Sequence, residues 1–280
     1  SGSGKTTLGW AIMRYLAGNA REIGGSISLQ GENLLQMPQR QVEQLRGGRL
    51  GMIFQDPQTS LNPLLTVGEQ LIETIQKSLK LREAAAADRA VELLEGVGIT
   101  EARARLNAYP HQFSGGMRQR VVIALALADD PDLIIADEPT TALDGSIQAQ
   151  ILNLFMDLRE QLGLTYLFIS HDLGVVEHLC DRVVVMYLGR VVESATVDEL
   201  FARANHPYTQ ALLAQIPKFE LRRSQFQAIR GEIPSPLNPP SGCHFHPRCP
   251  HATARCREEV PLLKEVSPHH LSACHLNLVS

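Results

Sequence analysis

The chain has 280 residues, 44% of them hydrophobic, so it can bury one sizeable core and still carry an additional segment. A formal net charge of -4 argues against a nucleic acid as the obligate partner. The apolar runs are short and interrupted by charged residues, which excludes a bilayer-spanning helix. Composition therefore favours a globular protein whose chemistry has to be found in its local motifs.

The first seven residues, SGSGKTT, indicate phosphate binding. Gly4-Lys5-Thr6 is the second half of the P-loop pattern G-x-x-x-x-G-K-[ST], whose first glycine would precede Ser1 by two places, so we expect a fragment that begins inside its own nucleotide site. Backbone N–H groups would cradle the phosphates, Lys5 would neutralise the β and γ groups, and Thr6 would hold Mg²⁺. The expected nucleotide-contacting set is Ser1, Gly2, Ser3, Gly4, Lys5, Thr6 and Thr7.

The next segments predict alternating strands and helices. An amphipathic helix is expected over Leu8 to Leu16, and GGSISLQGENLL predicts a strand, a turn at Gly31 and a short continuation. Leu50 to Phe54 predicts a buried strand that ends on Gln55. Helices are then expected over Val67 to Leu79 and Arg82 to Glu95, because both segments are rich in strong helix formers.

Two neighbouring segments carry the most specific signals. Ser114-Gly115-Gly116 opens a helix that runs from Met117 to Ala128, and the exposed N–H groups at such a start suit an anion. Leu133 to Ala136 predicts a strand buried on both faces. That strand delivers Asp137 and Glu138 to its C-terminal end, where open α/β sheets place their chemistry.

The pattern then returns to alternating helix and strand. Ile147 to Leu162 predicts a helix, and Leu164 to Ser170 predicts a buried strand followed at once by His171. Two more strands, Arg182 to Tyr187 and Arg190 to Ser194, are expected to close the core. An isolated histidine in a loop is usually only solvated, but its place after a buried strand favours a functional role.

In this order the motifs resemble those of ATP-binding cassette (ABC) ATPases. SGGMRQR resembles their signature motif, although Met117 replaces the common glutamine; LIIADEP resembles their Walker B strand, and ALD, ending at Asp144, their D-loop. Gln55 and His171 occupy the places of the Q-loop and the H-loop. The resemblance implies an α/β P-loop NTPase core with a helical subdomain inserted at about residues 66–130.

The same resemblance implies a role for each candidate residue. Asp137 would bind Mg²⁺ through water, and Glu138 would act as general base on the attacking water. Gln55 would reach Mg²⁺ and that water, and His171 would hydrogen-bond the γ-phosphate. Two cassettes would meet head to tail, so that each signature motif closes on nucleotide held by the partner's P-loop; the residues expected there are Ser114, Gly115, Gly116 and Asp144.

Two further segments resemble a particular branch of this family, the oligopeptide and dipeptide importers. These are the proline-rich loop DPQTSLNPLLTVGEQL and the later HPYTQALL. The resemblance implies an ATPase domain over residues 1–205 and a C-terminal extension over 206–280. It also implies a second ATPase subunit (identical or not), two membrane permeases, an indirect solute-binding partner and a peripheral position on the cytoplasmic face of the inner membrane. The imported solute cannot be identified from the sequence.

Two other classes share the ATPase motifs. Soluble ABC proteins of translation generally join two cassettes in one chain, and those of DNA repair insert a long coiled coil, whereas one cassette and no sustained heptads are found here. A non-hydrolysing partner of a heterodimer is the third possibility, but Glu138 and His171 are both intact.

Four of the five cysteines lie in the last segment, at Cys243, Cys249, Cys256 and Cys274, with spacing C-x5-C-x6-C-x17-C. Disulfides rank last, because they need an oxidising compartment. Zinc favours closer cysteine pairs, although His244, His246 or His275 could substitute. An iron–sulfur cluster accepts looser spacing, and members of the resembled importers carry a 4Fe–4S cluster on a matching tail. Cys180 is expected to be a core filler.

Overall fold

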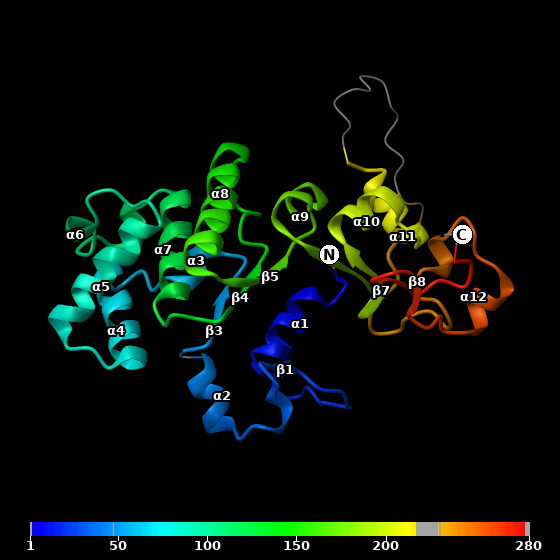
Figure 1. The fold of residues 1–280 in the computed structure, drawn as a ribbon, viewed down its shortest axis with the longest axis horizontal. Helices are drawn as coiled ribbons and strands as arrows, with labels where there is room; N and C mark the ends of the chain where they lie inside the picture. The colour runs from blue at the N-terminus through cyan, green and yellow to red at the C-terminus, as the bar shows by residue number, and fades with distance from the viewer. Residues whose placement is uncertain (1, 47, 217–228, 230, 278–280) are drawn as a thin grey trace. The chain divides into compact units, whose positions relative to one another are not determined.

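The computed structural model describes residues 2–46, 48–216, 229 and 231–277. The chain forms two compact units (Figure 1). We call Thr6–Ile169 the parallel-sheet unit, and Ser1–Lys5 together with Ser170–Ser280 the antiparallel-sheet unit. Across the described ranges, no helix combines the length and the apolar character that crossing a bilayer requires.

The parallel-sheet unit is built on three parallel strands in the order β3-β4-β5. These strands are β3 (Leu50–Ile53), β4 (Leu133–Asp137) and β5 (Thr165–Ile169). The central strand β4 is almost entirely buried, with Ile134, Ile135 and Ala136 at 0% exposure. Burial on both faces is what its uninterrupted apolar sequence predicts, so the expected α/β core is confirmed.

Helices account for most of the rest of this unit. A small hairpin, β1 (Ser28–Leu29) with β2 (Glu32–Asn33), turns at Gly31 as predicted, where φ is 87°. The helices are α1 (Lys5–Ile12, its first residue in the other unit), α2 (Gln39–Arg46), α3 (Pro57–Ser60), α4 (Val67–Leu79), α5 (Glu83–Gly96), α6 (Ala102–Arg105), α7 (Gly115–Leu127) and α8 (Gly145–Leu162), with 3-10 turns at Leu34–Gln36 and Pro110–Gln112.

Local sequence explains where two of these helices begin or end. The α4 prediction is confirmed, because Thr66 and Glu69 cap the helix reciprocally and satisfy two N–H groups of its first turn. The predicted end of the first helix is wrong: α1 stops at Ile12, not Leu16. Arg14 takes a positive φ of 49°, and its guanidinium donates to the backbone carbonyls of Leu34 and Met37, which draws the chain out of the helix.

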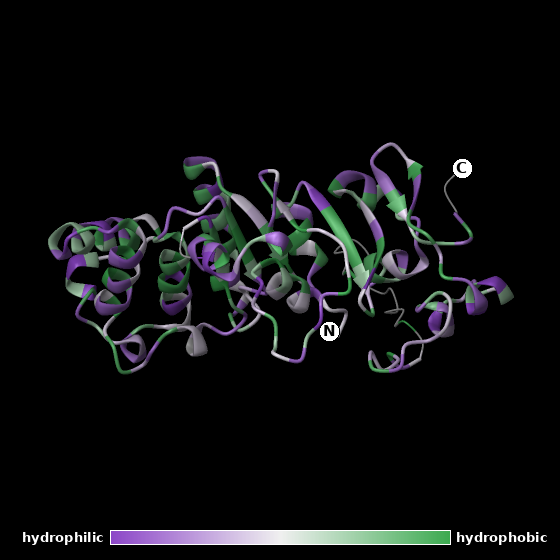
Figure 2. Cartoon of the chain, turned by 90° about the horizontal axis from the view of Figure 1, so that it is seen from below, coloured by the Kyte–Doolittle hydropathy of each residue, from purple (hydrophilic) through white to green (hydrophobic). Residues whose placement is uncertain are grey.

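The antiparallel-sheet unit holds four strands in the order β6-β7-β9-β8. They are β6 (Arg182–Tyr187), β7 (Arg190–Thr196), β8 (Lys264–Ser267) and β9 (His270–Ser272). The helices are α9 (Leu173–Leu179), α10 (Val197–Arg203), α11 (Pro207–Leu213) and α12 (Ala254–Glu258), with a 3-10 turn at His246–Arg248. Figure 2 shows both hydrophobic (green) and hydrophilic (purple) stretches along the strands of this unit.

The prediction that the first two of these strands, β6 and β7, close the core of the parallel sheet is wrong. β6 and β7 form where predicted, but they pair with the tail strands in a separate sheet and do not extend the parallel one. The signal for this pairing lies far along the chain, since Glu193 of β7 faces Ser272 of β9. The short, polar strands β8 and β9 carry no alternating apolar pattern, so they were not predicted.

A buried group of hydrogen bonds joins the tail strand β9 to β7. Glu193 is 0% exposed, and its carboxylate accepts hydrogen bonds from the backbone N–H groups of Asn205 (2.6 Å) and His206 (3.1 Å). The Nε2 atom of His270, also 0% exposed, lies 2.7 Å from the same carboxylate. Removing one partner would leave a buried polar group unsatisfied, which typically costs about 1–3 kcal/mol. The group therefore joins β7, β9 and the chain leading into α11.

A pH dependence of stability follows from His206, which is 1% exposed. Burial lowers its pKa from 6.5 to about 4, so below pH 6.5 the unfolded chain binds a proton that the folded chain does not. The free energy of unfolding of the antiparallel-sheet unit should therefore fall between about pH 6.5 and pH 4, by at most about 3 kcal/mol.

We expect His206→Asn to flatten this dependence when unfolding by urea is followed across that pH range. Asparagine can still accept the hydrogen bond that His206 Nδ1 receives from the N–H of Tyr208 at the start of α11. His178→Asn, at an exposed position on α9, is the matched control. An unchanged slope in His206→Asn would contradict the assignment.

Candidate nucleotide site and cysteine cluster

The predicted carboxylate pair stands at the C-terminal end of β4. Asp137, the last residue of the strand, is 3% exposed, and a carboxylate buried to that extent needs donors or a cation. Glu138 follows with a positive φ of 46°, while its N–H still donates to the carbonyl of Ile169 on β5 (2.9 Å). Unusual backbone of this kind clusters at functional sites. The turn aims the two adjacent carboxylates differently.

Two side chains donate hydrogen bonds to the same oxygen of Glu138. Gln55, two residues beyond the end of β3, donates from Nε2 to Glu138 Oε2 at 3.1 Å. The hydroxyl of Thr141 donates to that oxygen at 3.0 Å. The structure thus brings two predicted site residues, Gln55 and Glu138, into contact. Thr141 was missed, because nothing distinguishes it in sequence from Thr140 beside it.

The signature motif and the D-loop each cap a helix. Ser114 accepts a hydrogen bond from the N–H of Met117 and starts α7, and Asp144 accepts one from the N–H of Ile147 and starts α8. A side chain on Gly116 would place its Cβ 2.6 Å from Ile147 Cγ2, whereas at Gly115 the nearest atom is 3.9 Å away. Gly116 therefore allows α7 to pack closely on α8.

This difference between neighbouring glycines is testable. Gly116→Ala should lower the free energy of unfolding of the parallel-sheet unit by about 1–3 kcal/mol, because overpacking forces α7 and α8 apart. Gly115→Ala should be neutral or slightly stabilising, since alanine at an unstrained position loses less backbone freedom on folding. Urea unfolding of the two variants measures the difference. Equal stabilities would contradict the close packing.

The segment predicted to bind phosphates belongs to the antiparallel-sheet unit as far as Lys5, and Thr6 and Thr7 belong to the parallel-sheet unit. Gly2 and Gly4 have φ of 80° and 87°, and the carbonyl of the buried Ser3 accepts a hydrogen bond from the N–H of Gly189 (3.0 Å). Lys5 opens α1, so Thr6 and Thr7 lie in its first turn. Ser1 lies outside the described residues.

The rest of α1 is fixed by close packing in the parallel-sheet unit. A Cβ on Gly9 would lie 3.3 Å from both Ile135 of β4 and Ile169 of β5. The absence of a side chain therefore lets the helix that follows the phosphate loop lie against the strand that ends in Asp137.

His171 belongs to the antiparallel-sheet unit, two residues after β5 ends. It is exposed, in a bend just before Asp172, whose side chain caps α9. A strand does precede this histidine as predicted, but the prediction that the strand is buried is wrong, because only Ile169 of β5 is buried. The catalytic role of His171 stays a prediction.

The four tail cysteines converge without forming disulfides. The N–H of Cys243 donates to the carbonyl of Cys256 (2.9 Å), and Cys256 is 7% exposed on α12. Burial, and then the charges of the neighbouring thiols, raise the pKa values of Cys243 and Cys249. Burial likewise raises the pKa of Cys274, with Cys256 and Glu193 adding to it.

The proximity of the four thiols does not by itself provide the geometry of a metal-binding site. Among residues 2–46, 48–216, 229 and 231–277, no three His, Cys, Asp or Glu side chains are arranged to hold a metal ion. The predicted 4Fe–4S cluster and its zinc alternative are not shown by this arrangement. Cys180 packs with the apolar core of its unit, as expected.

Comparisons with known proteins agree with this geometry. Residues 1–141 match the ABC transporter family, and residues 192–256 match the oligopeptide/dipeptide transporter C-terminal region. A probable peptide ABC transporter ATP-binding protein of Sinorhizobium fredii is 50% identical over 98% of this chain and 82% of its own length. The oligopeptide transport ATP-binding protein OppD of Salmonella typhimurium is 46% identical over 98% of this chain and 81% of its own.

Solved structures give the same result for the fold. A dimeric ATP-binding cassette in a post-hydrolysis state, bound to ADP and Pi, is 28% identical with a TM-score of 0.60, covering 70% of this chain and 81% of that one. The cbiO1 protein of Clostridium perfringens, part of an ABC transporter complex, is 29% identical with a TM-score of 0.63, covering 72% and 76%.

Proposed function

Because this chain belongs to the ABC transporter family of ATP-binding proteins, we propose that it is the subunit that hydrolyses ATP to drive peptide import. Membership of the family implies an ATPase that uses ATP and Mg²⁺. The observation that supports hydrolysis here is the carboxylate of Glu138, held at the end of β4 by Gln55 and Thr141.

The role of each site residue in hydrolysis follows from its charge and from how far its side chain can reach. The P-loop N–H groups and Lys5 would bind phosphates, while Thr6, Asp137 and Gln55 would hold Mg²⁺. Bound Mg²⁺ would supply charge neutralisation at the phosphates. Glu138 takes the proton of the attacking water, and its two hydrogen-bond donors keep its carboxylate in one orientation. His171 orients that water from the γ-phosphate side.

Two cassettes complete each site. Ser114, Gly115, Gly116 and Asp144 lie at the N-terminal ends of α7 and α8, and helix N-termini favour a phosphate brought by a partner. Support for pairing comes from the dimeric cassette bound to ADP and Pi. The partner is either a second copy of this chain or a different ATPase.

Import of peptides is supported by the segment that follows the cassette. Residues 192–256 match the oligopeptide/dipeptide transporter C-terminal region, which favours transport over the translation and DNA-repair classes. We therefore assign two membrane permeases and, through them, a solute-binding protein as partners. The subunit would lie peripherally on the cytoplasmic face of the inner membrane. We also retain residues 1–205 as the ATPase domain and 206–280 as the extension.

The tail thiols suit a 4Fe–4S cluster better than zinc. Cys243, Cys249, Cys256 and Cys274 come from loops and short elements with little core of their own, so a shared cofactor would cross-link them. The cluster would supply order to this segment, because nothing else in the chain suggests electron transfer.

Transport in proteoliposomes tests the proposal. The full-length subunit is reconstituted in vesicles with its permeases, partner ATPase and binding protein. These vesicles should take up labelled peptides of about two to five residues only when ATP is present. Lys5→Ala should abolish uptake, whereas Lys77→Ala, at an exposed position on α4, should not. ATP hydrolysis that never responds to permease or peptide would favour a soluble, non-transport role.

A further inference from the structure

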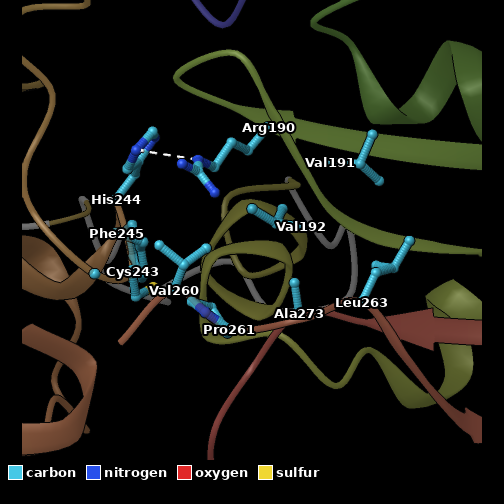
Figure 3. Close-up of a pocket in the computed structure, with 11 residues that line it drawn as sticks. Arg190, Val191, Val192, Cys243, His244, Phe245, Val260, Pro261, Leu263 and Ala273 are labelled. Atoms are coloured by element: carbon cyan, nitrogen blue, oxygen red, sulfur yellow. Dashed lines mark hydrogen bonds between the residues drawn. The ribbon is translucent and has the colours of Figure 1, made fainter. Parts of the chain in front are cut away.

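The antiparallel-sheet unit contains a pocket that the nucleotide chemistry does not use. Its volume is about 240 Å³, below the roughly 300–1,000 Å³ of pockets for drug-sized ligands, so it suits a small molecule. The walls come from β7, from residues 242–245 and 260–263, and from Ala273 just after β9. Figure 3 shows Val192, Val260, Pro261, Leu263 and Ala273 around a space with Arg190 and His244 at one side.

The polar side of this pocket has a fixed hydrogen-bond arrangement. Arg190 Nε lies 3.1 Å from His244 Nε2, and since a guanidinium can only donate, that ring nitrogen is the acceptor. The proton of His244 is therefore on Nδ1, which donates to the carbonyl of Leu188 at 3.1 Å. This chain of two bonds orients the guanidinium at the pocket and leaves its terminal N–H groups uncommitted to His244 (Figure 3).

Arg190, the first residue of β7, has no carboxylate partner among the described residues. Arg49, for comparison, pairs with Asp132 at 2.7 Å and with Glu32 at 3.5 Å. Within the described ranges, Arg190 makes no ion pair, and no Asp or Glu lines the pocket. The pocket thus combines a guanidinium that no carboxylate neutralises with an apolar wall.

We propose that this pocket binds a small organic monocarboxylate with a compact, uncharged apolar body. The carboxylate pairs with the two terminal nitrogens of Arg190, a geometry that a planar guanidinium matches. The body packs on Val192, Val260 and Leu263. A free amino acid is disfavoured, because the lining offers no carboxylate to its ammonium group. Of the four tail thiols Cys243 lines the pocket, so the pocket adjoins the cysteine cluster and shares that one residue with it.

Calorimetric titration of the full chain without nucleotide tests the proposal independently of peptide import. The probes are isocaproate, its uncharged analogue isocaproamide, and leucine, which adds only an ammonium group to isocaproate. Isocaproate should bind saturably, and both analogues at least about tenfold more weakly, since a charge-assisted pair is lost or opposed. Arg190→Gln should weaken isocaproate binding at least about tenfold. Arg182→Gln, exposed on β6, should leave it unchanged.

A second variant guards against a folding defect at Arg190. Val260→Trp keeps the guanidinium but fills the pocket from a position that is 43% exposed, so it should also abolish binding while unfolding at the same urea concentration as the parent chain. Equal binding of isocaproate and isocaproamide would overturn the proposal. So would undiminished binding by Arg190→Gln, or the absence of saturable binding at millimolar concentrations.

Discussion

Replacing Glu138 by glutamine is expected to leave Mg-ATP binding intact and to slow hydrolysis at least about a hundredfold, the usual contribution of a general base. Glutamine keeps the size of the side chain but has no carboxylate to take the proton of water. The measurement is steady-state phosphate release by the assembled transporter, together with nucleotide binding to the same preparation.

The control for this experiment is Glu160→Gln, at an exposed position on α8 of the same unit. It should hydrolyse ATP at the parent rate. Thr141→Val provides a graded test, because it removes one of the two hydrogen bonds to Glu138 and should reduce the rate less than Glu138→Gln. Near-parent turnover by Glu138→Gln would mean that another group activates the water.

Anaerobically purified protein is expected to be brown and to contain roughly four irons per chain, as a cubane held by four thiolates requires. Replacing Cys243, Cys249, Cys256 or Cys274 by serine should remove most of that iron. Cys180→Ser should keep it, because Cys180 lies between α9 and β6, far along the chain from the tail segment that carries the four thiols. Iron and zinc are counted by elemental analysis of each variant.

Serine at Cys249 is the most informative single change, because this half-buried side chain follows a 3-10 turn and can be altered without disturbing a strand. Colourless protein with one zinc per chain would replace iron–sulfur by the zinc alternative. Protein that holds neither metal, yet unfolds like the parent chain, would show that packing alone orders the four thiols.

Much of the parallel-sheet unit could be predicted, because its signals are local. The uninterrupted apolar run from Leu133 to Ala136 predicts a strand buried on both faces. The carboxylates after it mark the end of that strand. The contact between Gln55 and Glu138 follows from this logic, since adjacent parallel strands end at one edge. Thr141 was not predictable, because its role depends on the positive φ of Glu138 and not on a motif.

The antiparallel-sheet unit could be predicted only in part, because its pairing is non-local. Strands Arg182–Tyr187 and Arg190–Thr196 carry their own apolar pattern and were found. Their partner His270–Ser272 is three residues long and includes two polar side chains that are fully buried. The buried His270 has a hydrogen-bond partner because Glu193 lies within reach on the neighbouring strand, and that complementarity is invisible until both strands are in place.

The pairing of Glu193 with Ser272 also sets an order of events during synthesis. The ribosome completes β7 about 80 residues before β9, which at roughly 5–20 residues per second leaves one edge of β7 open for about 4–16 seconds. An open strand edge is a template for pairing with a neighbouring nascent chain. Over that interval the Glu193 side chain lacks its hydrogen bond with His270, and the hydration of this polar group disfavours a wrong partner until the tail is synthesised.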